Sequence, residues 1–201
     1  MAELIVMVHS LLCRVFRTCL LRLAAILLFS AQLTAAGSAP SNQFKEYEVK
    51  AAFLLRFIEF AQWPPSALGA ASEPFVIAIV GSDPFGQVID RLAAGQTAFG
   101  RPVVVRRIPW GPAVGKCEVL FVPADQSDKI SQIAKWVQSK PVLTVGESPG
   151  FAHRHGIVNF FLESGRVRFE INNEAAKAAN LSLSSRLLSL AKLVVGERAA
   201  K

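Results

Sequence analysis

The fold is decided by the stretch Pro74-Phe75-Val76-Ile77-Ala78-Ile79-Val80-Gly81-Ser82-Asp83-Pro84. Its apolar run is uninterrupted, which is typical of a strand covered on both faces, as in a parallel sheet. The glycine and proline that follow predict a turn and then a helix through about residue 94. A buried strand followed at once by a helix is the first half of a βαβ unit.

Strands alternate with helical patterns further along the chain. Apolar runs predict strands over 102–108, 118–122 and 142–145. A helix over 127–138 lies between the last two of these runs, since its apolar residues recur every three to four positions. This alternation predicts a single α/β domain with a largely parallel sheet flanked by helices.

Upstream of the first strand, residues 44–63 predict a helix that Pro64-Pro65 ends. The helix carries two apolar stripes, which indicates cover on more than one side. The first stripe is Tyr47, Ala51, Leu54, Ile58 and Ala61, and the second is Val49, Phe53, Phe57 and Phe60. Arg56 interrupts this pattern, so its side chain either extends to water or contacts an anion.

The spacing of the apolar residues changes in the C-terminal part of the chain. Residues 156–162 and 166–171 predict a β-hairpin around the short loop Glu163-Ser164-Gly165. Alternation places Arg166, Arg168 and Glu170 together on one polar face of the second strand. Asn172 or Asn173 can cap a helix that begins near Glu174. A closing amphipathic helix is predicted from Leu183, Leu187, Leu190, Ala191 and Val194.

The N-terminus has the pattern of a secretory signal. Residues 23–33 are largely apolar, follow several arginines and lead into the small residues Thr34-Ala35-Ala36. The apolar run is shorter than the roughly 20 residues that span a bilayer. We therefore expect residues 1–36 to be a cleaved signal peptide and 37–201 to be an exported domain. Cleavage leaves Cys117 as the one cysteine, which excludes an intrachain disulfide.

Patterns that suggest catalysis fail on physical grounds. Residues 146–150 match the G-x-S-x-G motif, but Pro149 lacks the backbone N–H that an oxyanion hole needs after Ser148. His153 and His155 are spaced to share a metal on a strand, but further ligands are missing, so an exposed loop is favoured. The net charge of +7 comes from scattered charges, which does not predict nucleic-acid binding. No enzyme activity, metal or cofactor is expected.

Arginine and aromatic side chains remain as candidate binding residues. Arginines can hold a carboxylate bidentately while rings stack on the rest of a ligand, and the same residue types anchor protein partners. A surface ion-pair lattice over core phenylalanines is the alternative. The candidate residues are Phe53, Arg56, Phe57, Trp63, Glu163, Arg166 and Arg168.

The sequence resembles the YfiR family of periplasmic proteins. The resemblance is carried by residues 48–64, 79–86, 117–122, 142–152, 156–160, 168–172 and 181–188. It implies a small α/β protein, often dimeric, that binds the periplasmic sensory domain of an inner-membrane diguanylate cyclase. It further implies that the bound cyclase is inactive, which lowers cyclic di-GMP and biofilm formation, and that an outer-membrane lipoprotein can sequester the repressor.

The resemblance also implies a small aromatic ligand near Phe53 and Arg56, with Glu163, Arg166 and Arg168 as the matching hairpin residues. Two departures stand out. First, family members with redox-controlled activity carry paired cysteines, whereas the mature chain has Cys117 alone, so the one disulfide that it could form is a bridge between subunits. Second, the family usually has glycine at the position of His155.

Two other classes of function stay open from the sequence. One is a periplasmic sensor module that presents an aromatic or carboxylate ligand to a membrane histidine kinase. The other is a metal-dependent enzyme that uses His153 and His155.

Overall fold

The computed structural model describes residues 40–111, 114–154 and 156–196. The predicted signal peptide lies outside these residues, and the described residues from 42 onward form one compact unit. None of the helices in the described part is long and apolar enough to cross a bilayer. The helices are α2 (Pro40–Phe60), α3 (Pro65–Leu68), α4 (Gln87–Ala93), α5 (Ile130–Val137), α6 (Asn173–Ala178) and α7 (Ser185–Leu190), with a 3₁₀ turn η1 at Ala124–Lys129.

An eight-stranded sheet organises this unit in the order β10-β8-β7-β6-β5-β2-β4-β3, and a two-stranded sheet pairs β1 with β9. The pairs β4–β2, β2–β5, β5–β6 and β6–β7 are parallel, so the predicted α/β fold with a largely parallel sheet is confirmed. The strands are β1 (Ala61–Gln62), β2 (Phe75–Val80), β3 (Thr97–Ala98), β4 (Arg101–Ile108), β5 (Val119–Val122), β6 (Leu143–Gly146), β7 (Val158–Glu163), β8 (Arg166–Ile171), β9 (Ser182–Leu183) and β10 (Lys192–Leu193).

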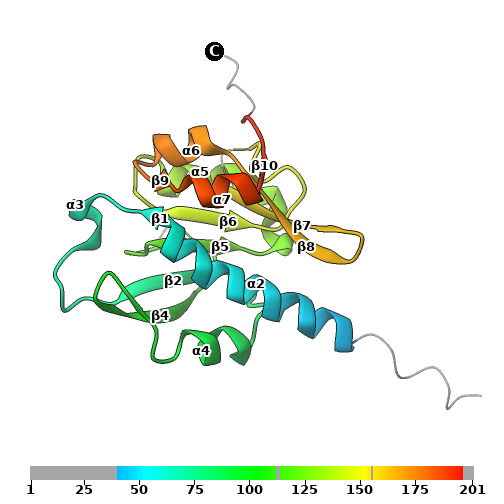
Figure 1. Cartoon of the computed structure of the whole chain (residues 1–201), viewed down its shortest axis with the longest axis horizontal. Helices are drawn as coiled ribbons and strands as arrows, with labels where there is room; N and C mark the ends of the chain where they lie inside the picture. The colour runs from blue at the N-terminus through cyan, green and yellow to red at the C-terminus, as the bar shows by residue number, and fades with distance from the viewer. Residues whose placement is uncertain (1–39, 112–113, 155, 197–201) are drawn as a thin grey trace, which may run out of the picture. The chain divides into compact units, whose positions relative to one another are not determined.

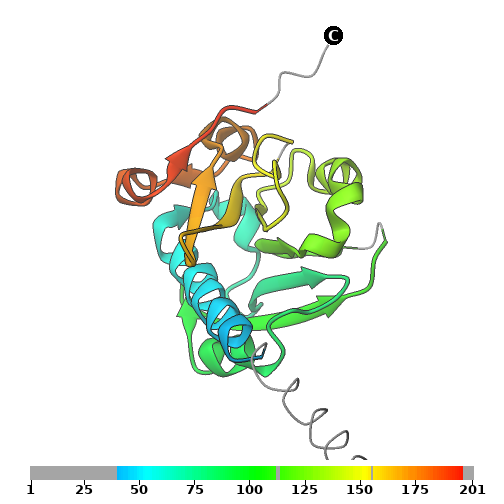
Figure 2. The ribbon, with the colours of Figure 1, turned by 90° about the vertical axis from the view of Figure 1, so that its right-hand side faces the viewer.

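Strand β2 shows why its sequence is apolar without interruption. Phe75, Ile77 and Ile79 belong to one core cluster, which also contains residues of α2, α4, α6 and α7. The alternate residues of β2 belong to a second cluster, which includes Ile130 and Ile133 of α5. Because successive side chains of a strand point to opposite faces, both faces of the sheet are covered. Figure 1 shows α2 crossing the sheet, and Figure 2 shows α5 on the side opposite to α2.

The hairpin is confirmed, with a tighter turn than predicted. Glu163 pairs with Arg166, so the loop consists of Ser164 and Gly165 alone. Both residues have positive φ, 50° and 72°, which a two-residue hairpin turn of the primed type requires. Asn172 caps α6 as predicted, because its side chain accepts a hydrogen bond from Ala175 N at 3.0 Å.

The helix boundaries differ from the prediction. Helix α2 begins at Pro40 instead of residue 44 and ends at Phe60 instead of residue 63, because Ala61 and Gln62 pair with β9. The region predicted as the helix 127–138 begins as the 3₁₀ turn η1 and becomes α-helical only at Ile130.

The closing helix is present but much shorter than its apolar pattern predicts. The Ser184 hydroxyl caps α7 by accepting from Leu187 N at 3.2 Å, so the helix begins after the β9 pairing. It ends before β10, which pairs with β8, and Val194 N donates to Ile171 O. The apolar residues between 183 and 194 therefore belong to three short elements instead of one helix face.

Candidate functional site

An aromatic cluster joins α2 to the hairpin, and Figures 1 and 2 show α2 running beside β7 and β8. The cluster consists of Phe53 and Phe57 of α2, Phe160 of β7 and Phe169 of β8. The Phe57 ring stacks on Phe160 with centroids 5.7 Å apart and meets the Phe169 ring edge-on at 5.1 Å. Phe53 is half-buried and lies 5.4 Å from Phe169. Two predicted site residues are thus brought against the hairpin.

The predicted charged residues lie on the exposed parts of the same two elements. Arg56 Nη1 is 2.7 Å from Glu59 Oε2, and both side chains are more than half exposed. On the hairpin, Arg168 Nε is 3.6 Å from Glu163 Oε2, and Arg166 is also exposed. Exposed ion pairs of this kind stabilise a protein by at most about 1 kcal/mol, so these groups can exchange partners at little cost. We call Phe53, Arg56, Glu163, Arg166 and Arg168 the helix–hairpin surface.

Trp63 does not join this surface. The structure buries it against Phe75 and Phe99, with ring centroids 5.1 and 5.8 Å away. Because its ring packs against Phe75 of β2 and Phe99, which lies between β3 and β4, Trp63 supports the fold at a different place from the other candidates.

The residues that suggested catalysis lie in other environments. Ser148 is fully buried and its hydroxyl has no hydrogen-bond partner among the described residues. His153 Nδ1 is 3.1 Å from Val195 O, while His155 lies outside the described residues. Within 40–111, 114–154 and 156–196, no three His, Cys, Asp or Glu residues are grouped to hold a metal ion.

Cys117 is buried, and that burial raises the pKa of its thiol to about 12. A bridge from Cys117 to a second subunit would therefore require local opening of the chain, and the thiol is a poor nucleophile where it lies.

A buried charged cluster that the sequence reasoning missed lies at the carboxyl ends of β5 and β6. Lys50 Nζ is 2.5 Å from Glu46 Oε1 and 2.6 Å from Glu147 Oε2. The Tyr47 hydroxyl and the Ala124 N–H both donate to Glu147 Oε1, each at 3.2 Å. Burial, and next the charge of Glu147, raise the pKa of Tyr47 well above its usual range.

Two sequence signals point to this cluster. Lys50 falls on the first apolar stripe of α2, where a charged residue needs a partner. Glu147 directly follows a buried strand, and polar groups that follow parallel strands gather at one edge of the sheet, where ligands of open α/β sheets bind. The contact itself joins residues 97 positions apart, which no local pattern reveals.

Glu170 corrects a prediction. Alternation predicts Glu170 on the polar face with Arg166 and Arg168, but only 8% of Glu170 is exposed. Near the turn the hairpin extends into solvent, whereas its base lies inside the sheet between β6 and β10. There Glu170 pairs across the strands with Asn159, whose Nδ2 donates to Glu170 Oε1 at 3.1 Å.

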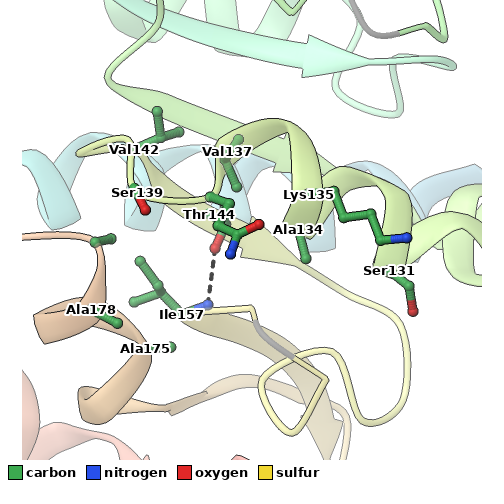
Figure 3. A pocket seen from close by; sticks show the side chains of 12 residues that line it. Ser131, Ala134, Lys135, Val137, Ser139, Val142, Thr144, Ile157, Ala175 and Ala178 are labelled. Atoms are coloured by element: carbon green, nitrogen blue, oxygen red, sulfur yellow. Dashed lines mark hydrogen bonds between the residues drawn. The ribbon is translucent and has the colours of Figure 1, made fainter. Parts of the chain in front are cut away.

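Two cavities are large enough to hold a small molecule. One, of about 500 Å³, is lined by residues of the charged cluster together with Asn159, Phe161 and Glu170. The other, of about 480 Å³, lies between α5 and α6 and is lined mainly by short side chains (Figure 3). There Thr144 Oγ1 accepts from Ile157 N at 3.0 Å, and Lys135 is the one ionisable residue among the described residues of the lining. The first cavity is therefore the better candidate for recognising a charged ligand.

Comparison with models of protein families finds a match. A model of the family described as YfiR/HmsC-like matches residues 47–192, which run from the middle of α2 to the beginning of β10. No curated protein matches the chain.

Proposed function

The chain belongs to the YfiR/HmsC-like family, and from this premise we propose that it is a periplasmic regulator of an inner-membrane diguanylate cyclase. In this proposal the protein binds the periplasmic sensory domain of the cyclase, keeps the enzyme inactive, and so lowers cyclic di-GMP and biofilm formation. The observation that carries the proposal is the family match over residues 47–192.

We assign the contact with the cyclase to the helix–hairpin surface. Arginine and aromatic side chains are enriched among the residues that dominate binding energy at protein interfaces. Phe53 is half-buried and offers part of its ring, while Arg56 and Arg168 are held by exposed ion pairs that a partner's carboxylates can replace. Phe57 is 1% exposed, so its role is to hold α2 against the hairpin.

Repression requires that the protein distinguish two states of the cyclase. A partner that binds active and inactive states equally shifts nothing, whereas a change from 1:99 to 99:1 needs about 10⁴-fold preference. A rigid helix–hairpin surface suits this task, because a preformed surface loses little conformational entropy on binding. No bond is made or broken in this mechanism.

The proposal includes four further elements. Residues 1–36 are removed as a signal peptide during export, a second copy of the chain forms a homodimer, and an outer-membrane lipoprotein relieves repression by sequestering the protein. A small aromatic ligand with a carboxylate would bind near Phe53 and Arg56, where ring stacking and a guanidinium are available together.

Deletion of the gene tests the proposal. We expect the deletion strain to contain more cyclic di-GMP than the parent and to form more biofilm, and a plasmid copy of the gene should restore both. The nucleotide is measured by mass spectrometry in extracts from several growth conditions. An unchanged level in every condition would refute the proposed regulation.

A further inference from the structure

We call the cavity at the carboxyl ends of β5 and β6 the acidic pocket. It contains a charged group, Glu170, that is not part of the helix–hairpin surface. Its volume, about 500 Å³, is in the range of small-molecule sites. Its lining combines side chains from the first half of α2, the residue after β6 and the base of the hairpin. The lining residues used below are Lys50, Glu147, Asn159, Phe161 and Glu170.

Glu170 is the central group of the acidic pocket. It is 8% exposed and forms no ion pair with any described side chain. Lys192, its backbone neighbour in β10, instead has its ammonium 5.9 Å from the centroid of the Phe161 ring. A buried carboxylate without a cation is costly, because desolvation is not offset by Coulomb attraction. The pocket therefore presents a carboxylate that forms no ion pair with a described side chain.

Asn159 fixes Glu170 as an acceptor. Its Nδ2 donates to Glu170 Oε1 at 3.1 Å, and its own Oδ1 is buried with no partner among the described residues. Turning the amide round would set Oδ1 against the carboxylate, so the donor must face Glu170. An unsatisfied buried acceptor is unfavourable, because the desolvation of its oxygen is not offset by a hydrogen bond. The second carboxylate oxygen of Glu170, Oε2, receives no hydrogen bond from the described residues. It is therefore the oxygen available to a ligand.

The remaining charges make the acidic pocket negative. The ammonium of Lys50 is already held between Glu46 and Glu147, so it does not neutralise Glu170. Three carboxylates thus face one lysine in the lining. Phe161 adds an aromatic ring that is half-buried, on which an apolar group or a cation can lie.

We propose that the acidic pocket binds a small organic molecule carrying a primary ammonium group, which donates to Glu170 while its apolar part lies on Phe161. This site adjoins the aromatic cluster, because Phe160 also lines the pocket, but its charged group, Glu170, lies on the face of β8 opposite to Phe169. Its ligand is a cation, in contrast to the carboxylate that Arg56 would attract.

Titration of the purified protein with benzylamine tests this site. Benzylamine is followed by saturation-transfer NMR, n-butylamine serves as a probe without a ring, and benzyl alcohol serves as the neutral analogue. We expect benzylamine to bind, n-butylamine to bind more weakly, and benzyl alcohol not to bind. Failure of both amines to bind at millimolar concentration, or equal binding of benzyl alcohol, would overturn the proposal.

Variants locate the binding. Glu170→Gln keeps the size and removes the charge, so benzylamine should bind about tenfold or more weakly, since a hydrogen bond to a charged group contributes about 1.5–3 kcal/mol. Glu170→Asp retains the charge and should give an intermediate affinity. Glu174→Gln, which alters an exposed carboxylate of α6 outside the pocket, is the control and should bind as the wild type does. Unchanged affinity in Glu170→Gln would place any amine binding elsewhere and contradict the assignment.

Discussion

Replacing Lys50 with methionine is expected to lower the free energy of unfolding by about 3–5 kcal/mol at neutral pH. The Lys50 side chain is 6% exposed, and that of Glu147, its partner, is 5% exposed. Methionine fills a similar volume but leaves the Glu147 carboxylate buried without a cation. Tyr47 and the Ala124 N–H still donate to Glu147, which orients the charge without neutralising it. Urea denaturation followed by circular dichroism measures the change.

A matched control separates the buried pair from an ordinary surface pair. Lys177 and Glu174 form an ion pair on α6 in which both side chains are more than half exposed, so Lys177→Met should change the stability by less than about 1 kcal/mol. In the double variant Lys50→Met, Glu147→Gln, part of the lost stability should return because no unpaired charge is left. If Lys50→Met and Lys177→Met cost the same, the charged cluster does not stabilise the protein as described.

Phe57→Ala is expected to cost about 3–5 kcal/mol, because it removes a fully buried ring and leaves a cavity between α2 and the hairpin. The Phe57 side chain contacts the rings of Phe53, Phe160 and Phe169, so the loss includes three aromatic contacts. Thermal and urea unfolding of the variant measure the effect.

The comparison for Phe57 is Phe44 in the same helix, which is mostly exposed. Phe44→Ala should stay within about 0.5 kcal/mol of the wild type. A small loss in Phe57→Ala would mean that α2 is not held to the hairpin through the aromatic cluster, and the helix–hairpin surface would then not be preformed.

The α/β fold could be predicted because strand burial is encoded locally. An apolar run such as Phe75–Val80 is required only where both faces of a strand are covered, and the strands at 102–108, 118–122 and 142–145 alternate with helices in the order that a parallel sheet needs. The hairpin was equally readable, since Gly165 supplies one of the two positive φ values of its turn.

The prediction failed where tertiary contacts decide the outcome. Apolar spacing between 183 and 194 suits one long helix, but pairing with β1 and β8 competes successfully for both ends of the segment. Strand alternation correctly placed the side chains of Glu170 and Phe169 on opposite faces of β8. It could not show that both faces are covered at the base of the hairpin. The partner of Lys50 could not be predicted, because Glu147 lies 97 positions away in the sequence.

The candidate site was predicted in part for the same reasons. Phe53 and Phe57 share a helix stripe, so their joint contact with the hairpin follows from periodicity once the hairpin packs on α2. Trp63 follows the helix in sequence but lies beyond the β1 pairing, which turns the chain toward Phe75. The acidic pocket combines α2, the end of β6 and the hairpin, and only the folded chain brings these three segments together.

Complementation of the deletion strain with charge-reversed variants tests the central claim most directly, and cyclic di-GMP is the quantity to measure. The double variant Arg166→Glu, Arg168→Glu alters the exposed hairpin charges, and Arg91→Glu alters an exposed arginine of α4, which packs against β4 in the other half of the sheet. At equal periplasmic amounts, the wild type and Arg91→Glu should return cyclic di-GMP to the parental level, and the double variant should leave it as high as in the deletion strain. Full restoration by the double variant would contradict the claim that the helix–hairpin surface carries the repression.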